Sequence, residues 1–171
     1  IDSATLANKA LEVIEAAHLF GFDGDHIEVV IHPQSIVHSM IRTTDGAAYA
    51  QLGNPDMTLP IINALTEGSR NLVKRLDFTK LSLHFEAPDY QRFPLLDLAF
   101  SILKRKGATA LAFNAADEVA VGAFLDGSIS YLRLIEVVQR TVEENWDEKI
   151  HDFDQILALD AKARDIARRH L

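Results

Sequence analysis

The residues best suited to chemistry lie in the first twelve positions of the chain. Asp2-Ser3-Ala4-Thr5 is followed by Asn8-Lys9 and, one helical turn later, by Glu12. At 100° per residue, Thr5, Asn8, Lys9 and Glu12 fall within an arc of about 100°. A hydroxyl, an amide and an ammonium group on one face suit a phosphate, and a carboxylate suits a divalent cation. These residue types predict a site for a phosphorylated sugar.

A simpler interpretation of the same residues stands beside this one. Lys9 and Glu12 form an i,i+3 pair of the kind found on any solvated helix, which contributes about 0.2–0.5 kcal/mol. Ser3 has the residue type of an ordinary helix N-cap. Spacing alone favours this second interpretation.

A helix over residues 2–20 is expected to position these groups. Its opposite side carries an apolar stripe, and Ser3 or Asp2 is expected to cap its free amides, where anions are favoured. Gly21 and the following turn residues end it, and Glu15 is expected to face solvent. The apolar stripe consists of Leu6, Ala10, Val13, Ile14 and Ala17.

The remaining pattern predicts an α+β fold, in which a small, mainly antiparallel sheet precedes a helical bundle. Thr44-Asp45-Gly46 predicts a hairpin turn. Strands are expected at 27–31, 36–42, 47–52 and 81–85, and helices at 57–65, 94–106, 109–125, 131–145 and 154–171.

Composition excludes several classes of protein. The 171 residues are 48% apolar and 25% charged, carry a net charge of −8 and include no cysteine. Disulfide frameworks, thiolate metal sites and thiol nucleophiles are therefore excluded, and an acidic chain does not suit nucleic acid. No apolar run reaches the ~18 residues of a membrane span and no signal-peptide pattern is present. We expect no membrane partner and a cytoplasmic location. Because the chain begins at Ile1, next to its own candidate site, we expect it to be a fragment.

Several strings, in order along the chain, resemble the 1-deoxy-D-xylulose 5-phosphate reductoisomerase family of the non-mevalonate isoprenoid pathway. The first are those around Ser3, Asn8 and Glu12. The others are Ile31–Met40, Gln51–Gly53, Pro55–Met57, Leu76–Phe78, Ala87–Asp89 and Leu111–Glu118. One departure is Asp117, which stands where the family commonly has an asparagine.

The resemblance implies an oxidoreductase and isomerase that converts 1-deoxy-D-xylulose 5-phosphate to 2-C-methyl-D-erythritol 4-phosphate. It implies NADPH, Mg²⁺ or Mn²⁺, a homodimer, and the plastid stroma as the location in a plant or alga. It also implies part of a catalytic and dimerisation domain at 1–67, a connector at 68–92 and a C-terminal helical domain at 93–171. The alternatives are a related oxidoreductase acting on another sugar phosphate, or a non-catalytic dimerisation module.

Residue roles are carried over position by position. Ser3 matches a phosphate-binding serine, Asn8 and Lys9 match residues that bind phosphate or sugar hydroxyls, and Glu12 matches a metal-binding glutamate. His38 matches an active-site histidine and Met57 a methionine that lies against the nicotinamide ring. Glu12 and His38 are the catalytic candidates. Without the resemblance, His38 is expected in the core, and Met57 is as readily a core residue at a helix start.

Other parts of the family pattern are missing from the chain. The resemblance implies that two further acidic metal ligands and the NADPH-binding domain precede Ile1. An isolated chain is therefore expected to be inactive. His32 is expected to be structural, and the segment 114–118 is expected to serve helix packing.

Overall fold

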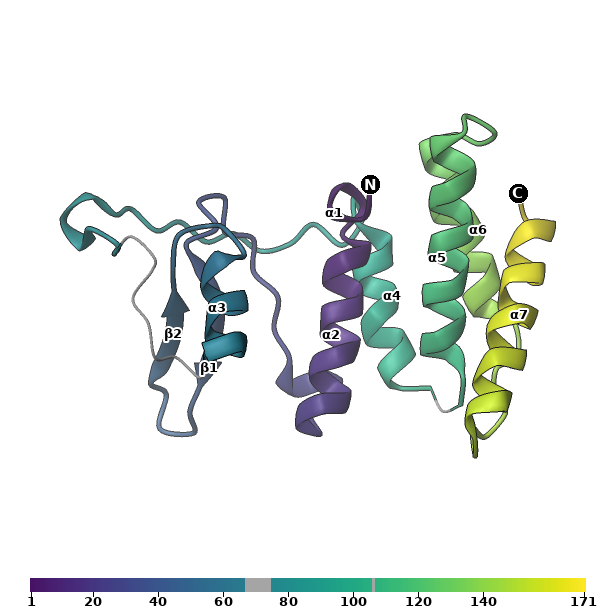
Figure 1. The fold of residues 1–171 in the computed structure, drawn as a ribbon, viewed down its shortest axis with the longest axis horizontal. Helices are drawn as coiled ribbons and strands as arrows, with labels where there is room; N and C mark the ends of the chain where they lie inside the picture. Colours follow the sequence, from purple (N-terminus) through teal and green to yellow (C-terminus); the bar gives the residue numbers. More distant parts are fainter. Residues whose placement is uncertain (67–74, 106) are drawn as a thin grey trace. The chain divides into compact units, whose positions relative to one another are not determined.

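The computed structural model describes residues 1–66, 75–105 and 107–171, which form two compact units. The first, which we call the helical unit, comprises Ile1–Glu28 and Asp89–Leu171. The second, the hairpin unit, comprises Val29–Pro88. Figure 1 labels the elements of both, and their mixture of helices with a small antiparallel sheet confirms the predicted α+β class.

The helical unit contains six α-helices. They are α1 (Asp2–Thr5), α2 (Ala7–Phe20), α4 (Pro94–Leu103), α5 (Thr109–Leu125), α6 (Tyr131–Glu143) and α7 (Phe153–Arg169), with a 3-10 turn at Gly24–His26. The four predicted helices of the C-terminal half are confirmed, with ends that differ by a few residues. Side-chain caps mark two of the starts, where Ser130 accepts from the Arg133 amide and Asp152 from the Gln155 amide.

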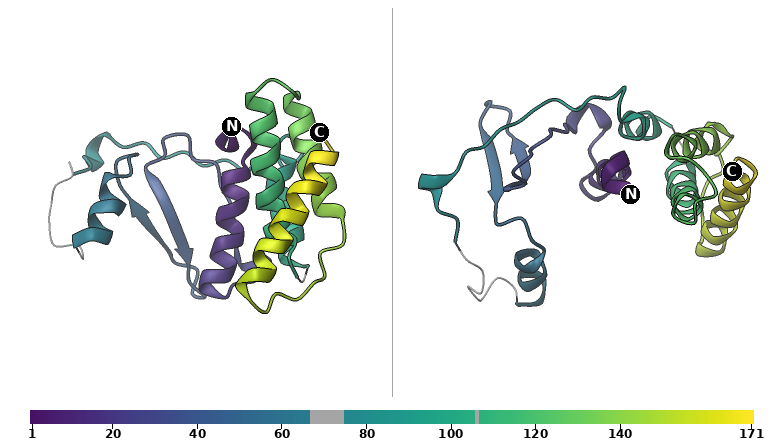
Figure 2. Two further views of the ribbon diagram at one scale, coloured as in Figure 1. Left: turned by 45° about the vertical axis from the view of Figure 1, so that its right-hand side comes forward. Right: turned by 90° about the horizontal axis from the view of Figure 1, so that it is seen from above.

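Small residues at the centre of this unit allow its helices to pack closely. Helix α5 buries alanines at five positions and packs against both α6 and α7, the helices coloured green to yellow in Figure 2. Helix α4 packs against α2, so the first residues of the chain belong with the helical unit. The buried alanines of α5 include Ala112, Ala115, Ala116 and Ala120. The packing role predicted for segment 114–118 is confirmed for Ala115 and Ala116.

The domain boundaries drawn from the sequence differ from these compact units. The sequence predicts that residues 1–28 share a domain with the sheet. In the structure they belong to the helical unit, in which the apolar stripe of α2 is buried. The predicted boundary at 67/68 lies outside the described residues. The division at 67 and 92 concerns the domains of a longer protein and stays a prediction.

The single helix predicted over residues 2–20 is wrong. Leu6 adopts a left-handed conformation, with φ 57° and ψ 22°, and separates α1 from α2. The Thr5 hydroxyl accepts from the Ala7 amide at 3.2 Å and donates to the carbonyl of Asp2 at 3.2 Å. Thr5 is therefore buried instead of lying on the polar face, and neither Ser3 nor Asp2 caps a helix.

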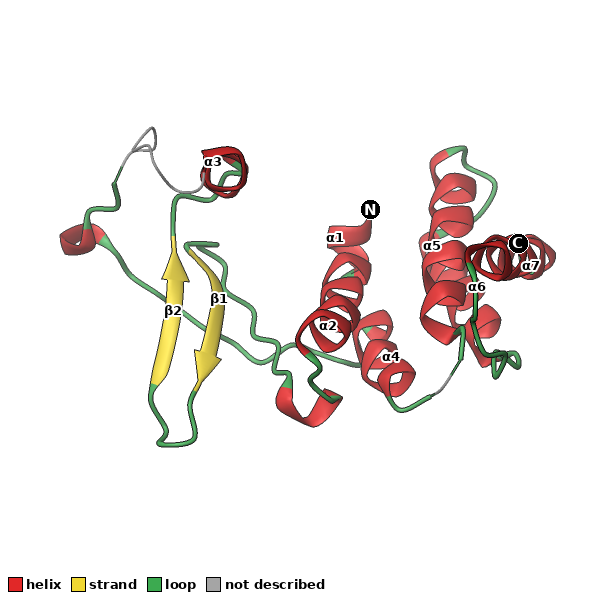
Figure 3. Cartoon of the chain, turned by 60° about the horizontal axis from the view of Figure 1, so that its bottom comes forward, coloured by secondary structure: helices red, strands yellow, loops and turns green. Residues whose placement is uncertain are grey.

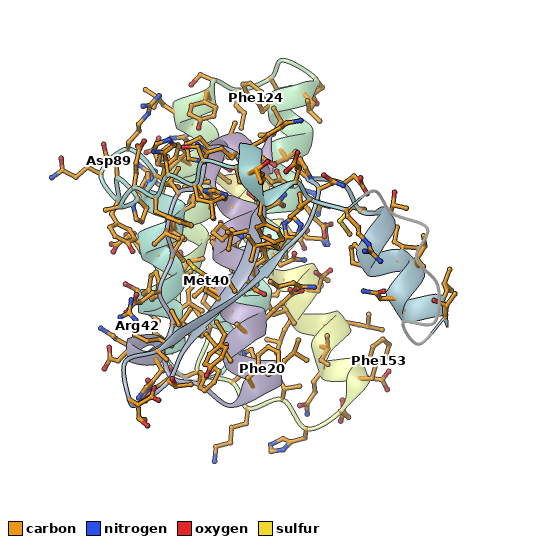
Figure 4. All side chains as sticks on the ribbon, turned by 90° about the vertical axis from the view of Figure 1, so that its left-hand side faces the viewer. Phe20, Met40, Arg42, Asp89, Phe124 and Phe153 are labelled. Carbon is orange, nitrogen blue, oxygen red and sulfur yellow. The ribbon has the colours of Figure 1, made fainter. Side chains whose placement is uncertain are left out.

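The hairpin unit is built around β1 (Val37–Arg42) and β2 (Ala48–Leu52), which pair antiparallel as Figure 3 shows. The predicted turn joins them, with Gly46 at φ 87°. The side chains of Met40 and Arg42 are exposed on β1 (Figure 4). Helix α3 (Thr58–Thr66) follows, as predicted, and a 3-10 turn spans Phe78–Lys80.

Two predicted strands are wrong. Residues 27–31 and 81–85 form no strand, and only an isolated antiparallel bridge joins Ile31 to Glu86. Ser35, with φ 51°, and Pro33 interrupt the extended course after Ile31. β-branched residues favour strands only where a neighbouring strand pairs with them, and the described residues supply one bridge at this place.

Among the described residues, no helix combines the length and the apolar character needed to cross a membrane.

In the helical unit, the backbone of Gly107 lies directly against the backbone of Trp146, the chain's single tryptophan. Gly107 has φ +85°, and a Cβ there would lie 2.0 Å from the backbone oxygen of Trp146. That oxygen accepts from the Ala108 amide at 2.8 Å. The indole donates to the carbonyl of Thr141 at 2.8 Å, and the Lys162 ammonium lies 4.7 Å from the ring centroid.

We therefore predict that Gly107→Ala destabilises the helical unit by about 3 kcal/mol or more, because backbone atoms cannot yield to a new methyl group. Gly127→Ala is the matched control, since Gly127 has φ +82° with open space around it. This control should cost only about 1 kcal/mol. Denaturant unfolding read by Trp146 fluorescence measures both, and equal losses would contradict the prediction.

Candidate functional site

Four of the predicted site residues lie together at the junction of α1 and α2. Asn8 Nδ2 donates to Ser3 Oγ at 3.4 Å, across the break at Leu6. The Lys9 ammonium pairs with Glu12 Oε2 one turn further along α2. The predicted grouping of these side chains is present, as two neighbouring polar pairs.

The opposite face of α2 explains why this group meets solvent. Five residues of α2 are buried, and four of them belong to the stripe predicted from the sequence. Leu6, the fifth predicted member, is half-buried because its left-handed backbone turns it off the helix. The buried residues are Ala7, Ala10, Val13, Ile14 and Ala17. Burial of this side leaves Asn8 and Glu12 exposed and Lys9 partly so.

The charges at the junction are available to ligands. The side chains of Lys9 and Glu12 are 40% and 56% exposed. An ion pair at this exposure stabilises a fold by less than about 1 kcal/mol. An anion can therefore replace Glu12 beside Lys9, and a cation can replace Lys9 beside Glu12, with little loss of folding free energy.

Glu12 suits a metal ion as one ligand of several. Its carboxylate offers the hard oxygen that Mg²⁺ prefers. No group of three or more histidine, aspartate or glutamate residues that could hold a metal ion occurs among the described residues. Glu15 is exposed, as predicted, and is not part of the polar cluster. Among the described residues, Glu12 therefore offers a single carboxylate, which is not a complete metal site.

The two remaining candidates lie in the hairpin unit. His38 is exposed on β1, at a register shift where Val37–Ser39 oppose only Gln51 and Leu52. A bulge of this kind redirects a side chain and is frequent beside active sites. Met57, just before α3, is 68% exposed. Neither residue is in a core among the described residues, so the core alternatives considered for both are wrong.

His32 has the structural surroundings predicted for it. Its Nδ1 lies 2.7 Å from the carbonyl oxygen of His84, and its ring stacks on Phe85 with centroids 4.7 Å apart. These contacts tie the two long segments of the hairpin unit together. His32 is therefore accounted for by packing.

The hairpin unit also has a hollow of about 330 Å³ beside β1. Its lining includes Gln34, Asn54, Arg75, Asp77 and Lys80. None of the six site residues predicted from the sequence lines it.

Asp117 is a polar residue whose importance the sequence analysis missed. It lies on α5 among buried alanines and is only 4% exposed. The pKa of its carboxyl is raised to about 7, first by burial and then by the negative charges of Asp2 and Glu118. The positive charge of the Ile1 amino group lowers this pKa by a smaller amount. An acidic residue within an otherwise small and apolar stretch was the available signal.

Tyr131, which was also missed, connects the same region to α6. Its hydroxyl donates to the carbonyl oxygen of Ala4 at 3.0 Å. The two residues are 127 positions apart in the sequence, so no local sequence pattern indicates this contact.

Comparison with known proteins decides the family. The family model described as the DXP reductoisomerase C-terminal domain matches residues 52–166, about two thirds of the chain. The chain belongs to this family. The resemblance noted in the sequence is thereby confirmed.

Relatives extend the similarity to the rest of the chain. A 1-deoxy-D-xylulose 5-phosphate reductoisomerase of Acidithiobacillus ferrooxidans is 50% identical over 174 aligned residues that cover 100% of this chain and 44% of the relative. The corresponding protein of Moorella thermoacetica is 51% identical over 96% of this chain and 43% of its own length. The chain spans less than half the length of the curated relatives it matches.

Solved structures show the same backbone. The reductoisomerase of Zymomonas mobilis in complex with NADPH superimposes with a TM-score of 0.92 at 43% identity, over 98% of this chain and 45% of that one. A reductoisomerase in complex with NADPH, fosmidomycin and magnesium gives 0.87 at 38% identity, over 99% and 44%. The α+β arrangement is therefore that of the family's C-terminal portion.

The raised pKa of Asp117 predicts a pH-dependent stability. The folded state holds the Asp117 proton more tightly than the unfolded state, so this stabilisation is complete below pH 4 and is lost as the pH rises to about 7. The loss is at most about 4 kcal/mol. In Asp117→Asn this part of the pH dependence should disappear.

Denaturant unfolding of the chain between pH 4 and 8 tests this expectation. Asp97→Asn is the control, because Asp97 is an exposed aspartate on the neighbouring helix α4. Identical pH profiles for Asp117→Asn and the control would contradict a tightly held proton at Asp117.

Proposed function

We propose that the protein containing this chain converts 1-deoxy-D-xylulose 5-phosphate to 2-C-methyl-D-erythritol 4-phosphate, with NADPH and a divalent metal, Mg²⁺ or Mn²⁺. The observation that carries this proposal is the exposed grouping of Ser3 with Asn8 and of Lys9 with Glu12, in a member of the DXP reductoisomerase C-terminal domain family. The relatives solved with NADPH, fosmidomycin and magnesium support the choice of cofactors.

Ser3, Asn8 and Lys9 bind the phosphorylated end of the substrate in this proposal. The Ser3 hydroxyl and the Asn8 amide each donate a hydrogen bond, and Lys9 supplies a positive charge on a flexible stem. The existing Asn8–Ser3 contact of 3.4 Å holds the two donors together before a phosphate arrives. Fixing one end of the substrate orients the carbon skeleton for rearrangement.

Glu12 is the metal ligand that this chain supplies. When bound, the metal polarises substrate oxygens as a Lewis acid. Glu12 directs a carboxylate oxygen toward the cation and is released from Lys9 as it does so. The remaining ligands are proposed to come from residues outside this chain.

His38 and Met57 serve the substrate and the cofactor. His38, exposed at the bulge of β1, donates a hydrogen bond to a substrate oxygen. Met57 places a polarizable thioether against the nicotinamide ring. Both roles follow from the family match at these positions.

A related oxidoreductase acting on another sugar phosphate is the second candidate. The donors at the α1–α2 junction recognise a phosphate, and Glu12 recognises a cation, whichever sugar lies between them. The longer protein that contains this chain, which we call the family-length protein, can be assayed on a panel of ketose and aldose phosphates. This assay separates the two candidates. Indifference to 1-deoxy-D-xylulose 5-phosphate would favour the second candidate.

We predict that Glu12→Gln in the family-length protein lowers kcat/KM more than about 100-fold, or roughly 2.7 kcal/mol in the barrier. The amide keeps the shape of the side chain and removes the charge that a metal requires. Glu15→Gln, at an exposed position on the same helix, should retain near-normal turnover. Steady-state kinetics measure both, and full activity of Glu12→Gln would reject its metal role.

The isolated 171-residue chain is predicted to show no turnover. It offers one carboxylate to the metal, and the NADPH-binding portion is proposed to lie outside it. Consumption of NADPH with 1-deoxy-D-xylulose 5-phosphate and Mg²⁺ measures this directly. Substrate-dependent NADPH oxidation by the pure chain would overturn the assignment of these parts to other residues.

A further inference from the structure

The segment that carries Ser3 is not a continuation of the helix that follows it. Leu6 breaks the backbone between α1 and α2 with φ 57°, a conformation that costs a residue with a side chain roughly 1 kcal/mol or more. Helix α1 has only four residues, too few to be stable by itself. Contacts from elsewhere must therefore fix where Ser3 lies.

We propose that Asp117 and Tyr131, two residues of the C-terminal helices, are positioning residues for the phosphate-binding segment, with Asp117 acting through a proton that it shares with Asp2. This inference rests on the proposed function, in which Ser3 binds the substrate phosphate. Asp117 and Tyr131 act on α1 and touch no substrate.

Tyr131 holds the far end of α1. Its hydroxyl donates to the carbonyl oxygen of Ala4, the residue next to Ser3, at 3.0 Å. Its ring meets Phe124 edge-on, with centroids 6.2 Å apart, and the Ser130 cap fixes the start of α6. A rigidly mounted hydroxyl therefore fixes one peptide of the segment.

Asp2 and Asp117 hold the near end. Each has a carboxyl oxygen, Oδ1, that is buried and has no hydrogen-bond partner among the described residues. Buried polar atoms are almost always paired. A single proton on the Asp117 carboxyl, donated to Asp2, satisfies both oxygens. Two carboxyl groups that act on each other hold one proton in this way.

The other charges near Asp117 are already engaged. Glu118, which also raises the pKa of Asp117, accepts from Asn114 at 3.1 Å and from Arg164 at 2.8 Å. Asp2 is the charged group with the largest influence on Asp117. The proposed bond between the Asp2 and Asp117 carboxyl groups is therefore the one that changes when the proton leaves.

Loss of that proton has a consequence for binding. Above about pH 7 the two carboxylates repel each other, and the proposed bond between α1 and α5 is lost. Ser3 then moves relative to Asn8 and Lys9, which belong to α2. Phosphate affinity should therefore fall as this proton is lost, although neither aspartate contacts the phosphate.

The hydroxyl of Tyr131 provides the first test, in the family-length protein. Tyr131→Phe should raise KM for 1-deoxy-D-xylulose 5-phosphate about five- to tenfold, with kcat within twofold. Tyr90→Phe is the control, because Tyr90 lies in the same unit and packs edge-on against Phe100. An unchanged KM in Tyr131→Phe would overturn the role of Tyr131.

The pH profile of KM provides the second test. Asp117→Asn keeps a donor toward Asp2 that does not titrate, so its KM should stay near the wild-type value at pH 6 and rise less than the wild-type KM up to pH 8.5. Asp117→Ala lacks the donor and should have a raised KM throughout this range. Superimposable profiles for wild type and Asp117→Asn would overturn the shared proton.

Hydrogen exchange separates failure of this inference from failure of the proposed function. In the family-length protein, without substrate, Tyr131→Phe and Asp117→Ala should speed amide exchange in residues 2–7 at least threefold and leave residues 153–169 of α7 unchanged. No change in residues 2–7 would overturn the positioning role. If exchange responds but the wild type does not turn over 1-deoxy-D-xylulose 5-phosphate, the substrate assignment has failed and the attachment of α1 stands.

Discussion

The packing of α2 against α4 decides which residues of the candidate site meet solvent. Residues such as Ala10, Val13 and Ile14 are buried on one side of α2, which turns Asn8, Lys9 and Glu12 outward. Burial of such side chains contributes roughly 1.5–3 kcal/mol for each large aliphatic residue, far more than the exposed Lys9–Glu12 pair can. Apolar packing therefore positions the charged groups.

A second constraint is the alanine-rich surface of α5. Because its side chains are small, α6 and α7 approach it closely, and little room remains for a charged group. Asp117 stands in this surface and cannot be solvated there. Its proton affinity is thus set by packing that involves no catalytic residue, and it acts on the segment that carries Ser3 through Asp2.

Sequence periodicity was sufficient to predict the long helices. It was insufficient where the structure depends on a distant partner or on a local side-chain bond. Helices such as α5 and α6 were predictable because their periodic patterns extend over three or more turns. The strand at 27–31 is predicted from β-branched residues and the one at 81–85 from a short apolar run, but a strand requires a partner that no local pattern supplies. At the break, the Ala7 amide donates to the Thr5 hydroxyl and Leu6 is left-handed, and helix propensity encodes neither feature.

The same distinction applies to the candidate site. Ser3, Asn8, Lys9 and Glu12 could be chosen as candidates because they lie within ten residues of one another and match a family pattern. Asp117 and Tyr131 escaped because their partners are more than 100 residues away in the sequence.

The separation between short-range and long-range residues also has a functional meaning. In the function proposed for this chain, residues close in sequence supply the groups that meet a ligand, and residues far away supply the position of those groups. A four-residue helix behind a left-handed leucine has no rigidity of its own, so its placement depends on the helices to which it is attached. The C-terminal helices are therefore part of the binding apparatus in energetic terms, although none of the ligand-binding side chains proposed in this chain belongs to them.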